Sequence, residues 1–195
     1  MPLKSLSEYE TLAAQAHGHL CAGQILGLRL AVHGLNLLRL DDPTGKDRKR
    51  LVTFVEIDRC ATDAITVVTG CRLGKRALKF RDFGKVAATF CDLATGRSVR
   101  VLARESSKQL AQERYPGIAG RNQQQMLAYR ELADSELFDH QWVRVAIGPE
   151  DMPGFKAERA ICEACGEAVN FRREVTQGGR TLCRACAGER YYEPA

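Results

Sequence analysis

Two pairs of cysteines in the C-terminal part constrain the fold of this chain more than any other feature. Cys162 and Cys165 form one C-x-x-C motif, and Cys183 and Cys186 form a second, with seventeen residues between them. Two residues between two thiolates let a tight turn direct both sulfurs at one ion, and two such turns complete a tetrahedral shell without an open position. The spacing therefore predicts a structural zinc site built by these four cysteines.

Disulfide bonds or a redox-active C-x-x-C motif are the alternatives for these cysteines. The pairing of two motifs favours zinc. The N-terminal sequence MPLKSLSEYE also favours it, because it lacks the apolar core of a signal peptide and predicts a cytoplasmic protein. Residues 168–175 and 180–183 predict a β-hairpin around two glycines, and residues 184–192 predict a helix that begins inside the second motif. This arrangement resembles a treble clef or a zinc ribbon.

A change in composition before these motifs predicts two domains. Residues 148–155, GPEDMPGF, contain two prolines and two glycines, as is typical of a linker. The chain has 195 residues, which is enough for one domain of ordinary size and a small second one. We therefore expect a core domain over residues 1–150 and a zinc-finger domain over residues 155–195.

Hydrophobic periodicity predicts the elements of the core domain. Residues 22–39 carry apolar side chains at three- and four-residue spacings, which indicates a buried helix that begins at Cys21. Its glycines, Gly27 and Gly34, favour close packing against a neighbour. The further predicted elements are strands at 51–57 and 142–147, a hairpin over 85–103, and helices at 61–68, 106–114 and 121–133. Helices, strands and a hairpin in this order predict an α+β fold.

Composition and charge argue against two classes of partner. The hydrophobic share of 45% and the charged share of 27% are those of a globular protein. The longest apolar run, residues 20–40, contains Arg29, His33 and Asn36, so it does not predict a membrane span. The net charge is only +5, and residues 155–195 contain seven basic and six acidic side chains. We therefore expect neither a membrane nor a nucleic-acid partner.

The segment AQAHGHLCAG places three residues that can bind a metal, His17, His19 and Cys21, at intervals of two. In an extended segment all three share one face, whereas in a helix His17 and Cys21 stack and His19 turns away. A thiol in the first turn of a helix also lies near unpaired backbone N–H groups, which favour its thiolate form. Cys21 is therefore the strongest candidate for a reactive or ligating thiol in the core.

Two further cysteines of the core, Cys60 and Cys71, are interleaved with acidic residues in VEIDRCATDAITVVTGC. Asp58 and Asp63 are candidates for orienting histidine ligands, by accepting a hydrogen bond from the ring nitrogen that does not bind the metal. The alternative is that the thiols only pack, because free cysteine is among the most buried residue types. For Cys91, inside KVAATFC, packing is the preferred interpretation.

Four segments in order, HGHLCAG, VEIDRCATDAI, TGCRLGK and FGKVAATFCDLATGRSVRV, resemble the FmdE family, named for the E component of formylmethanofuran dehydrogenase. The resemblance covers about residues 10–148. It implies an α+β core with a mixed β-sheet flanked by helices, a homodimer, and, in some members, a C-terminal zinc finger. It also implies a site made by His17, His19, Cys21 and Cys60, with Cys71 nearby. Two positions depart from the family pattern: Ala22 replaces a favoured proline, and GKRAL replaces GKGNL.

Three functions remain open from the sequence. The resemblance implies an accessory metalloprotein of a molybdenum or tungsten enzyme system, with the subunits of such an enzyme as partners. A stand-alone metal–thiolate enzyme or redox protein is the alternative, and a zinc-finger regulator ranks third because of the charge balance. In each case we expect one structural zinc, and the core cluster adds a candidate site for a second zinc or another transition metal.

Overall fold

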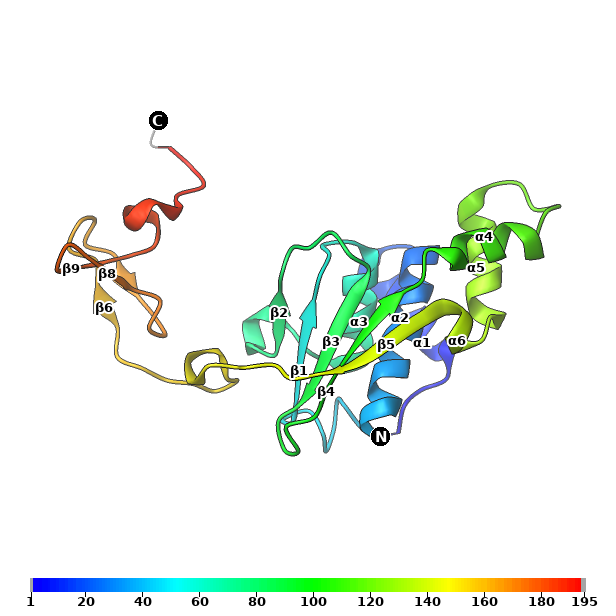
Figure 1. Cartoon of the computed structure of the whole chain (residues 1–195), viewed down its shortest axis with the longest axis horizontal. Coiled ribbons are helices and arrows are strands. Elements are labelled where there is room, and N and C mark those ends of the chain that lie inside the picture. Colours follow the sequence, from blue (N-terminus) through cyan, green and yellow to red (C-terminus); the bar gives the residue numbers. More distant parts are fainter. Residues whose placement is uncertain (1, 194–195) are drawn as a thin grey trace. The chain divides into compact units, whose positions relative to one another are not determined.

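The computed structural model describes residues 2–193 (Figure 1), and the chain divides into two compact units with the boundary in the sequence between Ala146 and Ile147. The first unit contains, in order, α1 (Leu6–His17), α2 (Ala22–Leu38), β1 (Leu51–Val55), α3 (Cys60–Thr69), η1 (Leu73–Lys75), β2 (Leu78–Phe80), β3 (Ala87–Asp92), β4 (Ser98–Ala103), α4 (Ser106–Arg114), α5 (Arg121–Glu131), α6 (Asp134–Leu137) and β5 (Phe138–Val143).

The five strands form one sheet in the order β2-β1-β3-β4-β5. β2 pairs parallel to β1, and the other neighbours pair antiparallel, so the sheet is mixed. Figure 1 shows α1, α2 and α3 gathered on one face of this sheet. The predicted α+β fold with a mixed sheet flanked by helices is therefore confirmed, as is the predicted hairpin, which β3 and β4 form.

One strand prediction was wrong in its position. The last strand was expected at residues 142–147, but β5 spans Phe138–Val143 and pairs with β4 from Ala103 to Ser98. β5 is an edge strand whose residues 139–142 are all exposed. Such a strand shows no alternation of apolar and polar residues, so its first half gave no pattern to recognise.

Helix α2 is the centre of the core, and its two glycines set its distance from its neighbours. A Cβ atom on Gly27 would lie 2.5 Å from the carbonyl oxygen of Ala61 in α3. A Cβ atom on Gly34 would lie 2.3 Å from the ring of Phe90 in β3. The close packing that the sequence predicted for these glycines is confirmed, and it brings the starts of α2 and α3 together.

The second unit is built from short elements: η2 (Pro149–Asp151), β6 (Ala160–Ile161), β7 (Ala168–Val169), β8 (Val175–Gln177), β9 (Arg180–Leu182) and η3 (Ala185–Glu189). β6 pairs with β7, and this hairpin encloses the first C-x-x-C motif. β8 pairs with β9, and this hairpin directly precedes the second motif. The predicted hairpin therefore begins at Val175, because residues 168–169 pair with β6 instead. The helix predicted for residues 184–192 is shorter in the structure, where only the π-helical stretch η3 forms. Gly188 inside η3 has a φ of 109°, which is not a helical conformation.

Within residues 2–193, none of the helices has the length and apolar character needed to span a lipid bilayer.

Candidate functional site

The four C-terminal cysteines converge in a geometry that fits one zinc ion. Their sulfur atoms all lie within 4.8 Å of one another, and the sulfurs of Cys165 and Cys183 are 3.9 Å apart. In a tetrahedral site with Zn–S bonds of about 2.3 Å, neighbouring sulfurs lie about 3.8 Å apart. All four cysteines are free thiols, so disulfide bonds are not what holds them together.

The backbone around each motif prepares the sulfurs for a cation. The amides of Cys183 and Cys165 donate toward Cys162 and lower the pKa of its thiol to about 6. At Cys165 the amide of Glu167 acts in the same direction, but the neighbouring thiols outweigh it and raise the pKa of Cys165 to about 12. Four thiolates cannot share this small volume without a positive charge between them, and a divalent ion supplies that charge.

In the core unit, His17 and His19 flank a turn that only glycine forms without strain. α1 ends at His17, and Gly18 follows with a φ of 92°, in the left-handed region. This turn places the two imidazole rings with their centroids 4.9 Å apart. Asp63 in the first turn of α3 contacts Nδ1 of His17 at 2.8 Å. That contact fixes the orientation of the His17 ring and joins the end of α1 to the start of α3.

Cys21 and Cys60 meet at the starts of two packed helices. Cys21 is the N-cap residue of α2, as predicted, and Cys60 is the first residue of α3. Burial raises the pKa of the Cys60 thiol, and a hydrogen bond with the Cys21 side chain raises it further. Gly23 lies against both: a Cβ atom there would be 3.5 Å from Cβ of Cys60 and 3.8 Å from the Cys21 sulfur. The structure thus brings together two thiols that are 39 positions apart.

A hollow of about 360 Å³ opens beside this cluster. His17, Cys60, Asp58 and Asp63 line it together with apolar side chains of β1 and β2. Both acidic residues selected from the sequence therefore line this hollow, and Asp63 makes the contact with histidine described above. The hollow gives a small molecule or an ion access to the Cys60 side of the site.

The structure does not bring Cys71 or Cys91 to this cluster. Cys71 follows the opposite end of α3, is 2% exposed, and its sulfur accepts a hydrogen bond from the hydroxyl of Thr53 at 3.5 Å. Burial raises the pKa of both thiols. Among residues 2–193 the four C-terminal cysteines form the one group of three or more histidine, cysteine or acidic side chains whose ligand atoms lie within 4.8 Å of one another. A metal in the core cluster stays a prediction.

One residue near the cluster gave no signal in the sequence. Asn122, in the first turn of α5, accepts a hydrogen bond from the amide of Ala22 at 3.1 Å. It thereby satisfies an amide at the start of α2, which has no partner within the helix. The two residues are 100 positions apart, so only the folded chain shows the contact.

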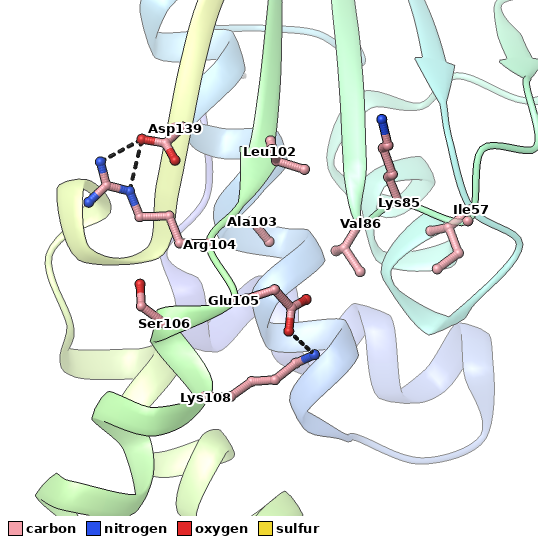
Figure 2. A pocket seen from close by; sticks show the side chains of 11 residues that line it. Ile57, Lys85, Val86, Leu102, Ala103, Arg104, Glu105, Ser106, Lys108 and Asp139 are labelled. Carbon is pink, nitrogen blue, oxygen red and sulfur yellow. Dashed lines mark hydrogen bonds and ion pairs between the residues drawn. The ribbon is translucent and has the colours of Figure 1, made fainter.

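Another hollow of the core unit, about 750 Å³, lies where strands β3 and β4 meet their connecting loops. Figure 2 shows two ion pairs at separate places on its rim, Arg104 with Asp139 and Lys108 with Glu105. Lys85 stands on another side, and within residues 2–193 its ammonium group makes no ion pair. The hollow therefore presents both signs of charge beside apolar side chains, as small-molecule sites commonly do.

Two family matches divide the chain as the two units do. The family described as "FmdE, Molybdenum formylmethanofuran dehydrogenase operon" matches residues 16–139, which include the whole histidine–cysteine cluster. The family described as "Prokaryotic dksA/traR C4-type zinc finger" matches residues 157–192, which include all four C-terminal cysteines.

Two individual proteins are also similar. A solved structure of a tungsten formylmethanofuran dehydrogenase FmdE-like protein from Syntrophus aciditrophicus has a TM-score of 0.65 and 22% identity, covering 97% of this chain and 96% of that one. This likeness shows the fold. A protein from Archaeoglobus fulgidus, "Probable S-adenosyl-L-methionine-binding protein", is 29% identical in an alignment of 210 residues that covers 97% of this chain. The chain spans 55% of that protein's length. Because its family match extends over more than half of the sequence, this zinc-finger-bearing chain belongs to the FmdE family.

Proposed function

We propose that the core unit is a metal-binding accessory component of a molybdenum or tungsten enzyme system of the formylmethanofuran dehydrogenase type. The observation that carries the metal-binding part is the meeting of Cys21 and Cys60 at the starts of α2 and α3, with His17 and Cys60 lining the same hollow. Thiolate and imidazole are the ligands that zinc and related transition metals prefer.

His19, Cys21 and Cys60 would hold the ion, and His17, oriented by Asp63, stands beside them. With three protein ligands, a zinc ion keeps a fourth position for water or for a carbonyl oxygen. The protein's own contribution is to hold the two thiols at the adjacent helix starts and to leave a hollow on the Cys60 side. A site with only three protein ligands also binds less tightly than the four-cysteine site.

Metal content tests this site. Protein dialysed against zinc under reducing conditions should hold one more equivalent per chain than the double variant Cys21→Ser, Cys60→Ala. Cys91→Ala is the matched control, because Cys91 is buried away from the cluster, and it should keep the full zinc content of the natural chain. A double variant that binds as many equivalents as the natural chain would show that the ion is bound elsewhere.

The accessory role rests on the names of the FmdE family and of the Syntrophus protein, which both refer to formylmethanofuran dehydrogenase. Affinity purification of the tagged chain from its own host, grown with molybdate or tungstate, tests it. Subunits of a molybdenum or tungsten enzyme should co-purify in amounts comparable to the chain. Recovery of the chain alone would favour the stand-alone metal–thiolate enzyme or redox protein.

We also propose that the chain is a homodimer, as the family resemblance implies. Light scattering at micromolar concentration should give twice the chain mass of 21.6 kDa. A mass of one chain, unchanged between zinc-loaded and zinc-free protein, would contradict this.

The name of the Archaeoglobus relative supports a second candidate function, the binding of S-adenosyl-L-methionine. The hollow of about 750 Å³ is suited to a ligand with an ammonium and a carboxylate group, because Asp139, Glu105 and Lys85 lie on its rim. Calorimetric titration should then detect binding that Lys85→Gln weakens at least about tenfold, or about 1.4 kcal/mol. Lys49→Gln, outside the hollow, is the control and should bind as the natural chain does.

A further inference from the structure

The four histidines of the chain lie in two pairs, and only one pair belongs to the cluster described above. His33 on α2 and His140 on β5 form the second pair, with ring centroids 5.6 Å apart and ring planes at 62°. The two pairs share one feature: a carboxylate contacts Nδ1 of one imidazole, Asp63 at His17 and Asp134 at His33. A carboxylate behind an imidazole is the usual support of a histidine that binds a metal.

The carboxylate behind His33 is itself held firmly. Asp134 contacts Nδ1 of His33 at 3.0 Å through one oxygen, and Arg29 donates to its other oxygen at 2.5 Å. Arg29 also donates to the carbonyl oxygens of Tyr129 and Leu132, so its guanidinium is fixed by the backbone. Because a carboxylate accepts the Nδ1 proton, the neutral imidazole of His33 presents the lone pair of Nε2 away from Asp134.

The second imidazole and the space for an ion lie next to His33. Phe138 stacks on the His33 ring at 5.7 Å and limits its movement. With Zn–N bonds of about 2.0–2.1 Å in a tetrahedral shell, the centroids of two imidazoles on one ion lie about 5 Å apart, close to the distance between His33 and His140. A hollow of about 290 Å³ is lined by both rings and by Asp134 and Asp139. That volume holds an ion with several waters, each of which occupies about 30 Å³.

We propose that His33 and His140 form a binding site for a divalent transition metal ion of the zinc, nickel or copper class, with water completing the shell. This site does not depend on the function proposed for the cysteine cluster, since its ligands are different residues. A bound ion would link α2 to the edge strand β5. In the sheet, β5 is paired on one side only, with β4. Metal binding should therefore stabilise this edge of the sheet.

Zinc titration of the untagged full-length chain, with its four-cysteine site already loaded, tests the proposal by NMR of the histidine ring nitrogens. In the Cys21→Ser, Cys60→Ala background, the resonances of His33 and His140 should shift together and saturate with one equivalent. His140→Gln should weaken this binding at least tenfold, and it should fold normally because His140 is exposed. His19→Gln, in the other histidine pair, is the matched control and should leave the binding unchanged.

A second variant separates metal binding from a purely structural role of the Asp134 contact. Loss of a carboxylate behind a metal-bound histidine lowers metal affinity about 10–100-fold. Asp134→Asn should therefore lower the affinity for zinc in this range and reduce the zinc-induced rise in the melting temperature. Resonances of His33 and His140 that do not respond to zinc, or a His140→Gln chain that binds zinc as tightly as its parent, would overturn the proposal.

Discussion

At the scale of single residues, Asp92 shows how a buried charge is made favourable in this core. Its side chain is 2% exposed at the end of β3, where burial alone would raise its pKa. Arg50 donates two hydrogen bonds to it, at 3.1 and 2.7 Å, and Thr95 and the amide of Ala94 donate two more. These donors outweigh burial and hold the pKa of Asp92 below its ordinary value.

Asp92→Asn should lower the free energy of unfolding by about 2 kcal/mol at pH 7, because an amide cannot accept both bonds from Arg50. The folded-state pKa is depressed, so the carboxylate stabilises the fold fully above the unfolded value of about 3.9 and loses this effect as the pH falls through the folded value. Urea unfolding followed by fluorescence of the single tryptophan, Trp142 in β5, should show the difference narrowing between pH 5 and pH 3. A difference that stays constant with pH would contradict this account.

At the scale of elements, the core site depends on how closely α2 approaches α3. Gly27 touches the backbone of Ala61, one residue beyond Cys60, and lies less than two helical turns from Cys21. The position of both thiols therefore follows from a helix–helix contact that only glycine permits. The apolar residues of α2 bury the helix, and the contact at Gly27 sets how closely Cys21 and Cys60 approach each other.

Gly27→Ala should destabilise the core by about 1–3 kcal/mol, since the new Cβ would lie 2.5 Å from a carbonyl oxygen and backbone must shift. Helix propensity alone would stabilise the alanine variant by about 1 kcal/mol. The sign of the measured change therefore shows whether the close contact or the helix propensity dominates. Gly117→Ala is the control, because a Cβ there meets nothing within 4 Å. Thermal unfolding measures both, and a Gly27→Ala chain as stable as the Gly117→Ala chain would disprove the close contact.

Periodic elements could be predicted from the sequence, and contacts between distant elements could not. The helix that begins at Cys21 and the β3–β4 hairpin follow from apolar spacing and a turn signal. Cys71 was grouped with Cys60 because the two are close in sequence, but α3 of 10 residues separates them by about 15 Å. The sequence did not indicate that His33 and His140 are neighbours. Their contact forms only when β5 pairs with β4 and thereby comes to lie beside α2.

At the scale of the whole molecule, the two units differ in what stabilises them. The core unit buries an extensive apolar cluster that includes Ile25, Leu28, Phe90 and Tyr129. In the second unit, within residues 147–193, Cys162 and Leu182 are the apolar side chains that are buried. A unit of this size with so small a core needs another source of stability.

Removal of zinc should therefore unfold the second unit and leave the core intact. Binding of a structural zinc supplies about 10–16 kcal/mol in small cysteine-rich modules, and here it also relieves the crowding of four thiols. After chelation under reducing conditions, amide hydrogen exchange in β8 and β9 should become fast, while Trp142 fluorescence in the core stays unchanged. Restoring zinc should slow exchange again in the natural chain, but not in the double variant Cys165→Ser, Cys183→Ser. Slow exchange in β8 and β9 that persists without zinc would show instead that the two hairpins fold on their own.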